Sequence, residues 1–131
     1  NIVIIVGKNH KLSNQSNISI KELNNLDIIN REKGSETRRV FEDCLKKNNV
    51  KVNSIMEVTR SSMIRGVYEN MGIGILSEPE FYDFKEMKKI NLIDVKIFTQ
   101  AHVVCLKSKQ NNNLIKAFLT AAKKHVQFLS N

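Results

Sequence analysis

The sequence predicts an α/β fold in which parallel strands alternate with helices. Short aliphatic runs of strand length and amphipathic helical stripes follow one another through the middle of the chain. This order implies parallel pairing with right-handed crossovers. The 131 residues are 41% hydrophobic and 26% charged, so the chain is long and apolar enough for one domain with its own core.

Strands are expected where aliphatic residues run together. The first extends from Ile2 to Val6, and the others are predicted at residues 26–30, 52–58, 73–76, 92–98 and 101–107. A polar, turn-like stretch from Gly7 to Asn17 follows the first strand. Ser19 as a cap, with Glu22 three residues later, predicts one short helical turn over residues 19–23.

Three longer helices are expected. The first begins after the N-cap Ser35 and ends at Asn48 and Asn49, with an apolar stripe of Val40, Phe41, Cys44 and Leu45. The second is capped by Ser61 or Ser62 and ended by a left-handed Gly72, with a stripe of Met63, Ile64, Val67 and Met71. The last covers residues 113–129 and is expected to bury Ile115, Phe118, Leu119, Ala122, Val126 and Leu129.

Composition narrows the function classes. Basic residues outnumber acidic ones by 21 to 13, and this net charge of +8 permits nucleic-acid binding, but no run of five basic residues is present. No aliphatic stretch approaches the ~20 residues that span a bilayer, and no secretory signal is visible. The apolar neighbours of Cys44 and Cys105 favour a reduced, cytoplasmic protein. Without a CxxC, HExxH, P-loop or GxSxG pattern, no metal or cofactor is expected.

Hydroxyl side chains gather where two helices are predicted to begin just beyond strand ends. They are Ser35, Thr37, Thr59, Ser61 and Ser62, with Arg31 and Arg60 close by in sequence. Ligands of open α/β sheets bind at the carboxyl ends of strands, and helix N-termini present free N–H groups. The cluster therefore suits a small anion such as a carboxylate, a sulfate or a phosphate ester. Ordinary helix capping explains the same residues, and composition alone favours that interpretation.

A catalytic site is not expected. His102 and Cys105 form the only close histidine–cysteine pair, and residues three apart in one straight strand point to opposite faces. A catalytic site needs a nucleophile, a base and a group that stabilises charge, and the sequence offers no set of residues for these three roles.

Residues 34–42 resemble the G-S-x-T-R-R-x-F-E segment of LysR-type transcriptional regulators. Four further stretches resemble the same family in its order. Residues 2–12 are similar to its crossover strand and H-P-L turn, with Lys11 in place of proline. Residues 57–64 are similar to the next strand and helix start, and residues 66–77 to the run G-x-V-x-x-G-x-G-I-x-x-L-P, with Ser77 in place of proline. Residues 114–119 are similar to the closing helix.

The resemblance implies an effector-binding domain similar to type-2 periplasmic binding proteins. It implies a crossover strand and turn over about residues 1–12, the second subdomain over about 13–97, and a return strand and C-terminal helix of the first subdomain over about 98–131. The chain is thus expected to be a fragment that lacks the helix-turn-helix. An incomplete first subdomain would expose apolar surface, including residues 2–6, and invite self-association.

The resemblance also implies a function. Such domains bind a small effector between their subdomains, and binding controls a separate DNA-binding head. It implies a cytoplasmic protein that is not an enzyme and forms a homodimer or a higher homo-oligomer. By motif match, the effector-binding residues are Ser35, Thr37, Thr59, Ser61, Gly72, Ile73 and Gly74.

Three other functions remain open at this point. A solute-binding domain of a transport system has a similar fold and would need a signal peptide or a lipid-anchoring cysteine. A small α/β enzyme would use His102 or Cys105. Direct DNA binding through the +8 surface would weaken steeply with added salt.

Overall fold

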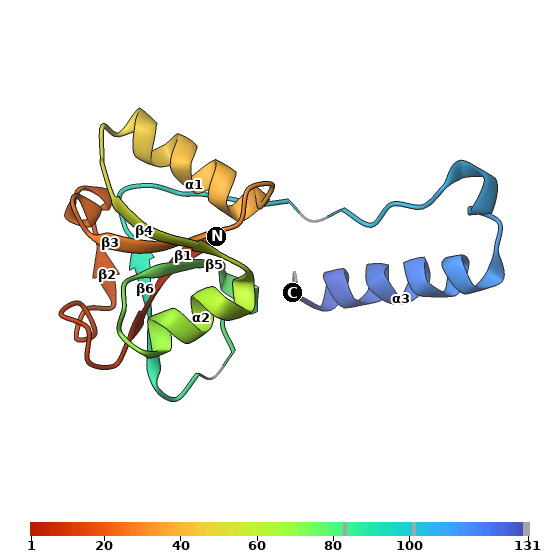
Figure 1. Cartoon of the computed structure of the whole chain (residues 1–131). Coiled ribbons are helices and arrows are strands. Elements are labelled where there is room, and N and C mark those ends of the chain that lie inside the picture. The colour runs from red at the N-terminus through yellow and green to blue at the C-terminus, as the bar shows by residue number, and fades with distance from the viewer. Residues whose placement is uncertain (83, 101, 130–131) are drawn as a thin grey trace. The chain divides into compact units, whose positions relative to one another are not determined.

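The computed structural model describes residues 1–82, 84–100 and 102–129, with side chains up to residue 125. The chain forms two compact units, residues 1–99 and residues 100–131. The first unit contains the strands, and the second contains the long C-terminal helix (Figure 1).

The first unit is an α/β structure of six strands. The strands are β1 (Ile2–Gly7), β2 (Asn17–Ile18), β3 (Asp27–Arg31), β4 (Asn53–Val58), β5 (Gly74–Ser77) and β6 (Met87–Leu92). The helices are α1 (Glu36–Lys47) and α2 (Arg60–Tyr68), with short 3-10 turns η1 (Ile20–Leu23) and η2 (Glu78–Glu80). The expected helical turn at Ser19 is confirmed, because Ser19 and Glu22 form a reciprocal capping box.

The strands pair in two sheets joined by one bridge. Four strands lie in the order β2-β6-β1-β5, with β1 antiparallel to both β5 and β6. β3 and β4 are parallel. A parallel bridge between Ile28 and Ile73 joins the two sheets, and the Ile29 N–H donates to the Ile73 carbonyl at 2.9 Å. The parallel pairing predicted for the middle of the chain is therefore confirmed.

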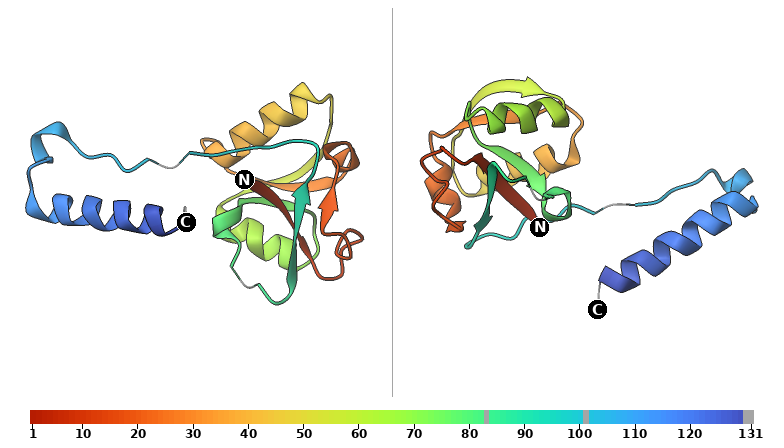
Figure 2. Two further views of the ribbon diagram at one scale, coloured as in Figure 1. Left: turned by 180° about the vertical axis from the view of Figure 1, so that it is seen from behind. Right: turned by 90° about the horizontal axis from the view of Figure 1, so that it is seen from below.

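Alternating strand residues face two cores. Ile4 and Ile28 pack on one face with Phe41 of α1, whereas Ile5 and Ile29 pack on the other with Met63 of α2. The helices thus cover opposite faces of the sheet (Figure 2). β1 is buried along its whole length between β5 and β6. The expectation that residues 2–6 would be exposed is wrong, since this first unit encloses them on both faces.

The strand predicted at residues 92–98 lies earlier in the chain. The observed strand is Met87–Leu92, and residues 95–100 form no regular element. Met87 and Ile90 are buried, Lys88 and Asn91 are exposed, and Lys89 is half-buried, so this strand lacks the simple alternation that marks a strand in a sequence. Beyond it, Ile97 is buried and its carbonyl accepts from the Ile2 N–H at 2.8 Å.

The second helix differs from the prediction at both ends. Its N-cap is Thr59, not Ser61 or Ser62, because the chain enters the helix directly from β4. The left-handed residue after it is Asn70 (φ 58°), a conformation that asparagine tolerates, and Gly72 does not adopt it. Met71 lies beyond the helix and is half exposed, so it is not part of the buried stripe.

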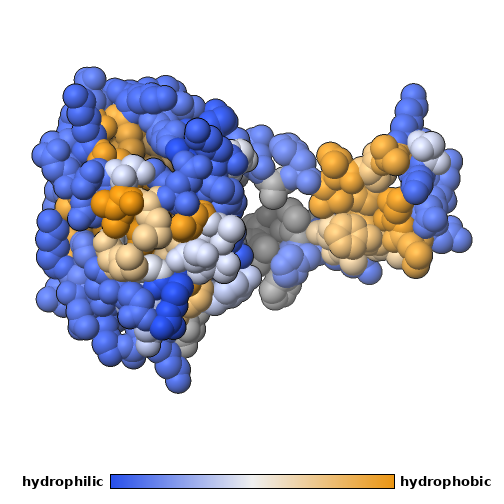
Figure 3. Space-filling view, in the orientation of Figure 1, coloured by the Kyte–Doolittle hydropathy of each residue, from blue (hydrophilic) through white to orange (hydrophobic). Residues whose placement is uncertain are grey.

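The second unit contains η3 (Lys107–Lys109) and α3 (Asn113–Leu129). The helix confirms the prediction for residues 113–129, but Phe118 is 61% exposed and Ile115, Leu119 and Ala122 are only half-buried. Apolar side chains are visible over much of this unit in Figure 3. The predicted side-chain burial of Val126 and Leu129 lies outside the described residues.

The strand predicted at residues 101–107 is not found where the structure describes this segment. Residues 102–106 have no regular structure, and residues 107–109 belong to η3. Ala101 lies outside the described residues. A strand is defined by hydrogen bonds to a neighbour, and the described part of the second unit offers this aliphatic segment no strand partner.

Candidate functional site

The carboxyl ends of β3, β4 and β5 lie at one edge of the first unit. In β3 and β4, Arg31 pairs with Val58 at this end. β5 runs in the same direction from its bridge at Ile73 and ends at Ser77. Both α1 and α2 begin just beyond these strand ends, so their N-termini share the edge. This edge, from residues 31–38, 57–62 and 77–80, is called the carboxyl edge below.

Ser35 and Thr37 stand at the start of α1. Ser35 is the N-cap, and its hydroxyl accepts a long hydrogen bond from the Arg38 N–H at 3.4 Å. The preceding Gly34 has a φ of 93°, a left-handed conformation that glycine adopts without strain. Thr37 is half-buried in the first turn. Two of the predicted site residues therefore lie on the carboxyl edge.

Thr59 and Ser61 stand at the start of α2. Thr59 is the N-cap by backbone geometry, but in the described structure its side chain does not accept a capping hydrogen bond. Its hydroxyl instead lies 3.3 Å from that of Ser61 and 3.1 Å from that of Ser62. Without a side-chain cap, the first N–H groups of α2 keep their capacity to bind an acceptor. Three exposed hydroxyls and a helix N-terminus thus converge at one point.

The cations of the carboxyl edge have carboxylate neighbours. Arg31 donates two hydrogen bonds to Glu32, at 3.1 and 2.8 Å, and its guanidinium lowers the pKa of that carboxyl to about 2. Arg38 forms ion pairs with Glu42 and Glu57. The excess charge lies elsewhere, since residues 100–131 hold five lysines and no acidic residue, which leaves +3 on residues 1–99. The site therefore offers oriented donors rather than a strongly positive surface.

Arg60 and Glu80 form a further ion pair at this edge. The Arg60 Nε lies 3.2 Å from a Glu80 carboxylate oxygen. The other Glu80 oxygen accepts from the Ser77 hydroxyl at 2.6 Å and from the Ser77 N–H at 3.0 Å. Burial raises the pKa of Glu80, but the Ser77 hydrogen bonds and the positive charges of Arg60 and Arg31 outweigh it and lower the pKa overall.

Three predicted site residues lie at the opposite end of the parallel strands. Gly72 approaches the start of β3, where an added Cβ would lie 2.9 Å from the Asp27 carbonyl oxygen. Ile73 is fully buried, and Gly74 packs against side chains of the core. The structure therefore places Ser35, Thr37, Thr59 and Ser61 on the carboxyl edge and Gly72, Ile73 and Gly74 away from it.

Sequence reasoning missed Ser77 and Glu80 as parts of this edge. Ser77-Glu78-Pro79-Glu80 has the serine and glutamate of a capping box, and the structure forms both of its hydrogen bonds. That spacing was a usable signal for the turn. The approach of Glu80 to Arg60, twenty residues away in sequence, had no local signal.

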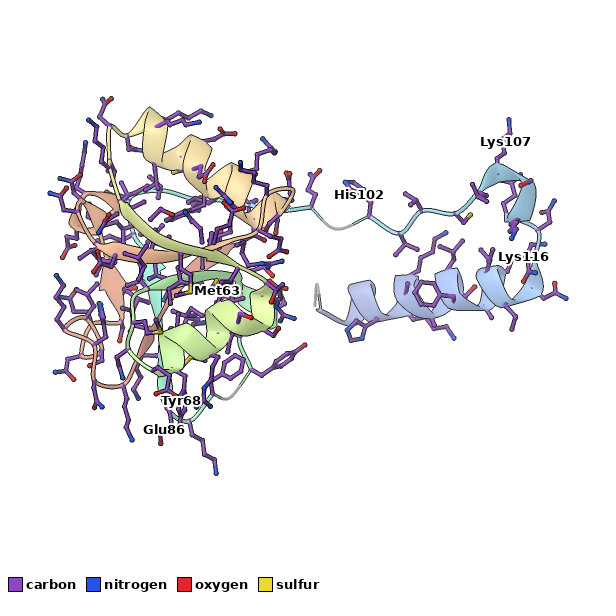
Figure 4. The ribbon with its side chains drawn as sticks, viewed as in Figure 1. Met63, Tyr68, Glu86, His102, Lys107 and Lys116 are labelled. Atoms are coloured by element: carbon purple, nitrogen blue, oxygen red, sulfur yellow. The ribbon has the colours of Figure 1, made fainter. Side chains whose placement is uncertain are left out.

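The remaining candidates lie outside this edge. His102 and Cys105 belong to the second unit, and among the described hydrogen bonds none joins them. Met63 points from α2 toward the sheet, and Tyr68 and Glu86 line an apolar groove between α2 and the start of β6 (Figure 4). Across the described ranges, no three His, Cys, Asp or Glu side chains could hold a metal ion together. No helix in those ranges is long and apolar enough to cross a bilayer.

A family model described as the LysR substrate binding domain matches residues 1–127. This chain belongs to that family. Within the LysR family, the transcriptional activator CmpR of Synechocystis, named as HTH-type, is 33% identical over 137 aligned residues. The match covers 98% of this chain and 44% of CmpR, so the chain spans less than half the length of that relative.

Solved LysR-family domains share the fold. The regulatory domain of Synechocystis CcmR, solved with 2-PG, has a TM-score of 0.68 at 23% identity and covers 92% of this chain and 60% of its own. The effector-binding domain of QuiR, solved with shikimate, has a TM-score of 0.68 at 20% identity. The match covers 95% of this chain and 62% of the QuiR chain. The predicted α/β fold, similar to type-2 periplasmic binding proteins, is therefore confirmed.

Proposed function

We propose that this chain is the effector-sensing part of a LysR-type transcriptional regulator and binds a small anion at the carboxyl edge. The observation that carries the proposal is the uncapped N-terminus of α2, where the hydroxyls of Thr59, Ser61 and Ser62 meet. Ser35 adds the start of α1 to the same edge. A carboxylate, sulfate or phosphate ester would accept from these N–H and O–H groups.

The known relatives support this class of function. CmpR carries the name of a transcriptional activator, and the QuiR domain binds shikimate, a carboxylate anion. The protein as a whole is proposed to act in the cytoplasm as a homodimer or a higher homo-oligomer. Its DNA contacts are proposed to come from a separate helix-turn-helix domain. No catalytic reaction is part of this proposal.

The site proposal keeps four of the predicted residues at the centre and gives the other three a different role. Ser35, Thr37, Thr59 and Ser61 face the effector from the two helix starts. Gly72, Ile73 and Gly74 fix the pairing of β5 with β3, because they lie where the two strands first meet. These three residues would not contact the effector, and they would affect its binding only by positioning the strands.

Removal of the hydroxyls tests the proposal. We expect the Ser35→Ala/Thr59→Val double variant to bind sulfate and shikimate roughly tenfold more weakly, since two donors to the anion are lost. Thr120→Val, whose hydroxyl bonds a carbonyl within α3, is the matched control and should bind as the parent chain does. Isothermal titration calorimetry measures both affinities. Equal binding by the double variant and the parent would refute the residue assignment.

A further inference from the structure

Arg60 is the arginine of the carboxyl edge whose hydrogen bonds are incomplete. Its Nε is buried and donates no hydrogen bond within the described structure, although Glu80 lies 3.2 Å away. By contrast, Arg31 donates two hydrogen bonds to Glu32. A buried N–H group that makes no hydrogen bond is costly, so the Arg60 Nε is a donor that a better-aligned acceptor would stabilise.

Glu80 is held by another residue. One of its carboxylate oxygens accepts hydrogen bonds from both the hydroxyl and the backbone N–H of Ser77. The bond from the N–H belongs to the capping box of the η2 turn. These short bonds fix the carboxylate beside Arg60 without the alignment that an arginine fork requires. Glu80 therefore neutralises Arg60 by its charge and leaves the Nε donor unsatisfied.

The position of Arg60 matches that of an incoming anion. It is the first residue of α2 and lies between Thr59 and Ser61, whose hydroxyls are exposed. Its side chain is 39% exposed and that of Glu80 is 31% exposed, so solvent reaches the pair. An anion seated at the start of α2 would thus meet the guanidinium and the negative charge of Glu80 together.

We infer that Arg60 contacts the anionic effector and that Glu80 is an internal counter-ion which the effector displaces from it. The inference rests on the proposed function, since Arg60 would be the cation of the proposed anion site and Glu80 would compete with the anion for it. Carboxylate and phosphate groups both match the arginine fork, so both classes of ligand would bind in this way. Glu80 lowers the affinity for either class, because its charge repels the anion and occupies Arg60 beforehand.

Glu80→Gln tests the competition with the cap preserved. A glutamine oxygen accepts the same Ser77 N–H, so the variant removes the charge and keeps the capping box. We expect its dissociation constant for sulfate, from amide shifts in NMR titrations, to fall roughly three- to tenfold. Glu69→Gln is the matched control, because Glu69 pairs with Arg65 at the other end of α2, outside the carboxyl edge, and its dissociation constant should remain that of the parent.

Arg60→Gln completes the test. We expect this variant to bind sulfate more weakly than the parent chain and to abolish the gain from Glu80→Gln when the two are combined. If the parent shows saturable sulfate shifts and Glu80→Gln does not tighten binding, the inference is wrong and the proposed function stands. If neither the parent nor Glu80→Gln shows saturable shifts, both fail. Binding by Glu80→Gln alone would support the inference in its strongest form.

Discussion

Arg38 of α1 forms an ion pair of 2.8 Å with Glu57 at the end of β4. The same guanidinium donates to the Arg31 carbonyl at 2.8 Å and to Glu42 at 2.7 Å. Only 16% of the Arg38 side chain is exposed. One arginine thus joins the first helix to the ends of two parallel strands and holds the carboxyl edge together.

The first prediction concerns the two neighbouring arginines of the G-S-x-T-R-R segment. Arg38→Leu should lower the free energy of unfolding by about 1–2 kcal/mol, because Glu42, Glu57 and a strand carbonyl lose their donor. Arg39→Leu should destabilise the fold much less than Arg38→Leu, since Arg39 is 60% exposed and pairs with Glu36 and Asp43 of its own helix. Urea unfolding followed by circular dichroism measures both. Equal losses would contradict the structural role of Arg38.

The second prediction concerns the core beneath α1. Phe41 is fully buried among aliphatic side chains of the sheet. Phe41→Ala should reduce the free energy of unfolding by about 3–5 kcal/mol through lost burial and the cavity left behind. Phe98→Ala is the control, because that ring is 61% exposed, and should change stability by less than about 0.5 kcal/mol. A stable Phe41→Ala protein would mean that α1 does not pack as described.

The third prediction separates packing from binding at Gly72. An alanine Cβ would press on the Asp27 carbonyl oxygen, so Gly72→Ala should cost about 1–3 kcal/mol of stability. Its dissociation constant for sulfate should stay within twofold of that of the parent at a temperature where both are folded. Chemical denaturation and calorimetric titration provide the two numbers. A stable variant that no longer binds sulfate would show that Gly72 belongs to the effector site.

The fourth prediction concerns acid stability. The hydrogen bond from the Ser19 hydroxyl (2.6 Å) and that from the Ile20 N–H (2.9 Å) lower the pKa of Asp94. A carboxyl whose pKa is lower in the folded state stabilises the fold above its unfolded pKa, about 3.9, and loses that contribution as the pH falls through the folded value. Asp94→Asn should therefore be less stable than the parent at pH 7.

The difference between Asp94→Asn and the parent should shrink steadily below about pH 4. Unfolding by urea at a series of pH values measures it. Ser19→Ala should reproduce part of the loss at pH 7, because it removes one of the two donors. A difference that stays constant from pH 7 to pH 2.5 would show that the Asp94 charge is not the cause.

Local patterns predicted the elements whose signals are contained in a few residues. The uninterrupted run Ile2–Val6 gave β1, and the spacing of Ser19 and Glu22 gave the capping box of η1. β6 was misplaced because Lys88 and Lys89 break its apolar pattern, and its burial depends on β1 beside it. A half-buried strand that contains two adjacent lysines has only a weak strand signal in the sequence.

The candidate site was only half predictable for a geometric reason. Ser35 and Thr59 follow the carboxyl ends of their strands, so their place on one edge follows from parallel pairing. Gly72 precedes its strand, which puts it at the amino end and away from them. Glu80 comes beside Arg60 only through the packing of η2 near the start of α2, and no short sequence pattern records that contact.

The most direct measurement is an NMR map of the backbone amides of this chain during titration with sulfate. We expect the largest saturable shifts at residues 35–38 and 60–62, the starts of α1 and α2. Residues 25–27 and 72–74, at the opposite end of the strands, should barely move. Shifts centred on that opposite end, or a titration without saturable shifts at either helix start, would contradict an anion site at the carboxyl edge.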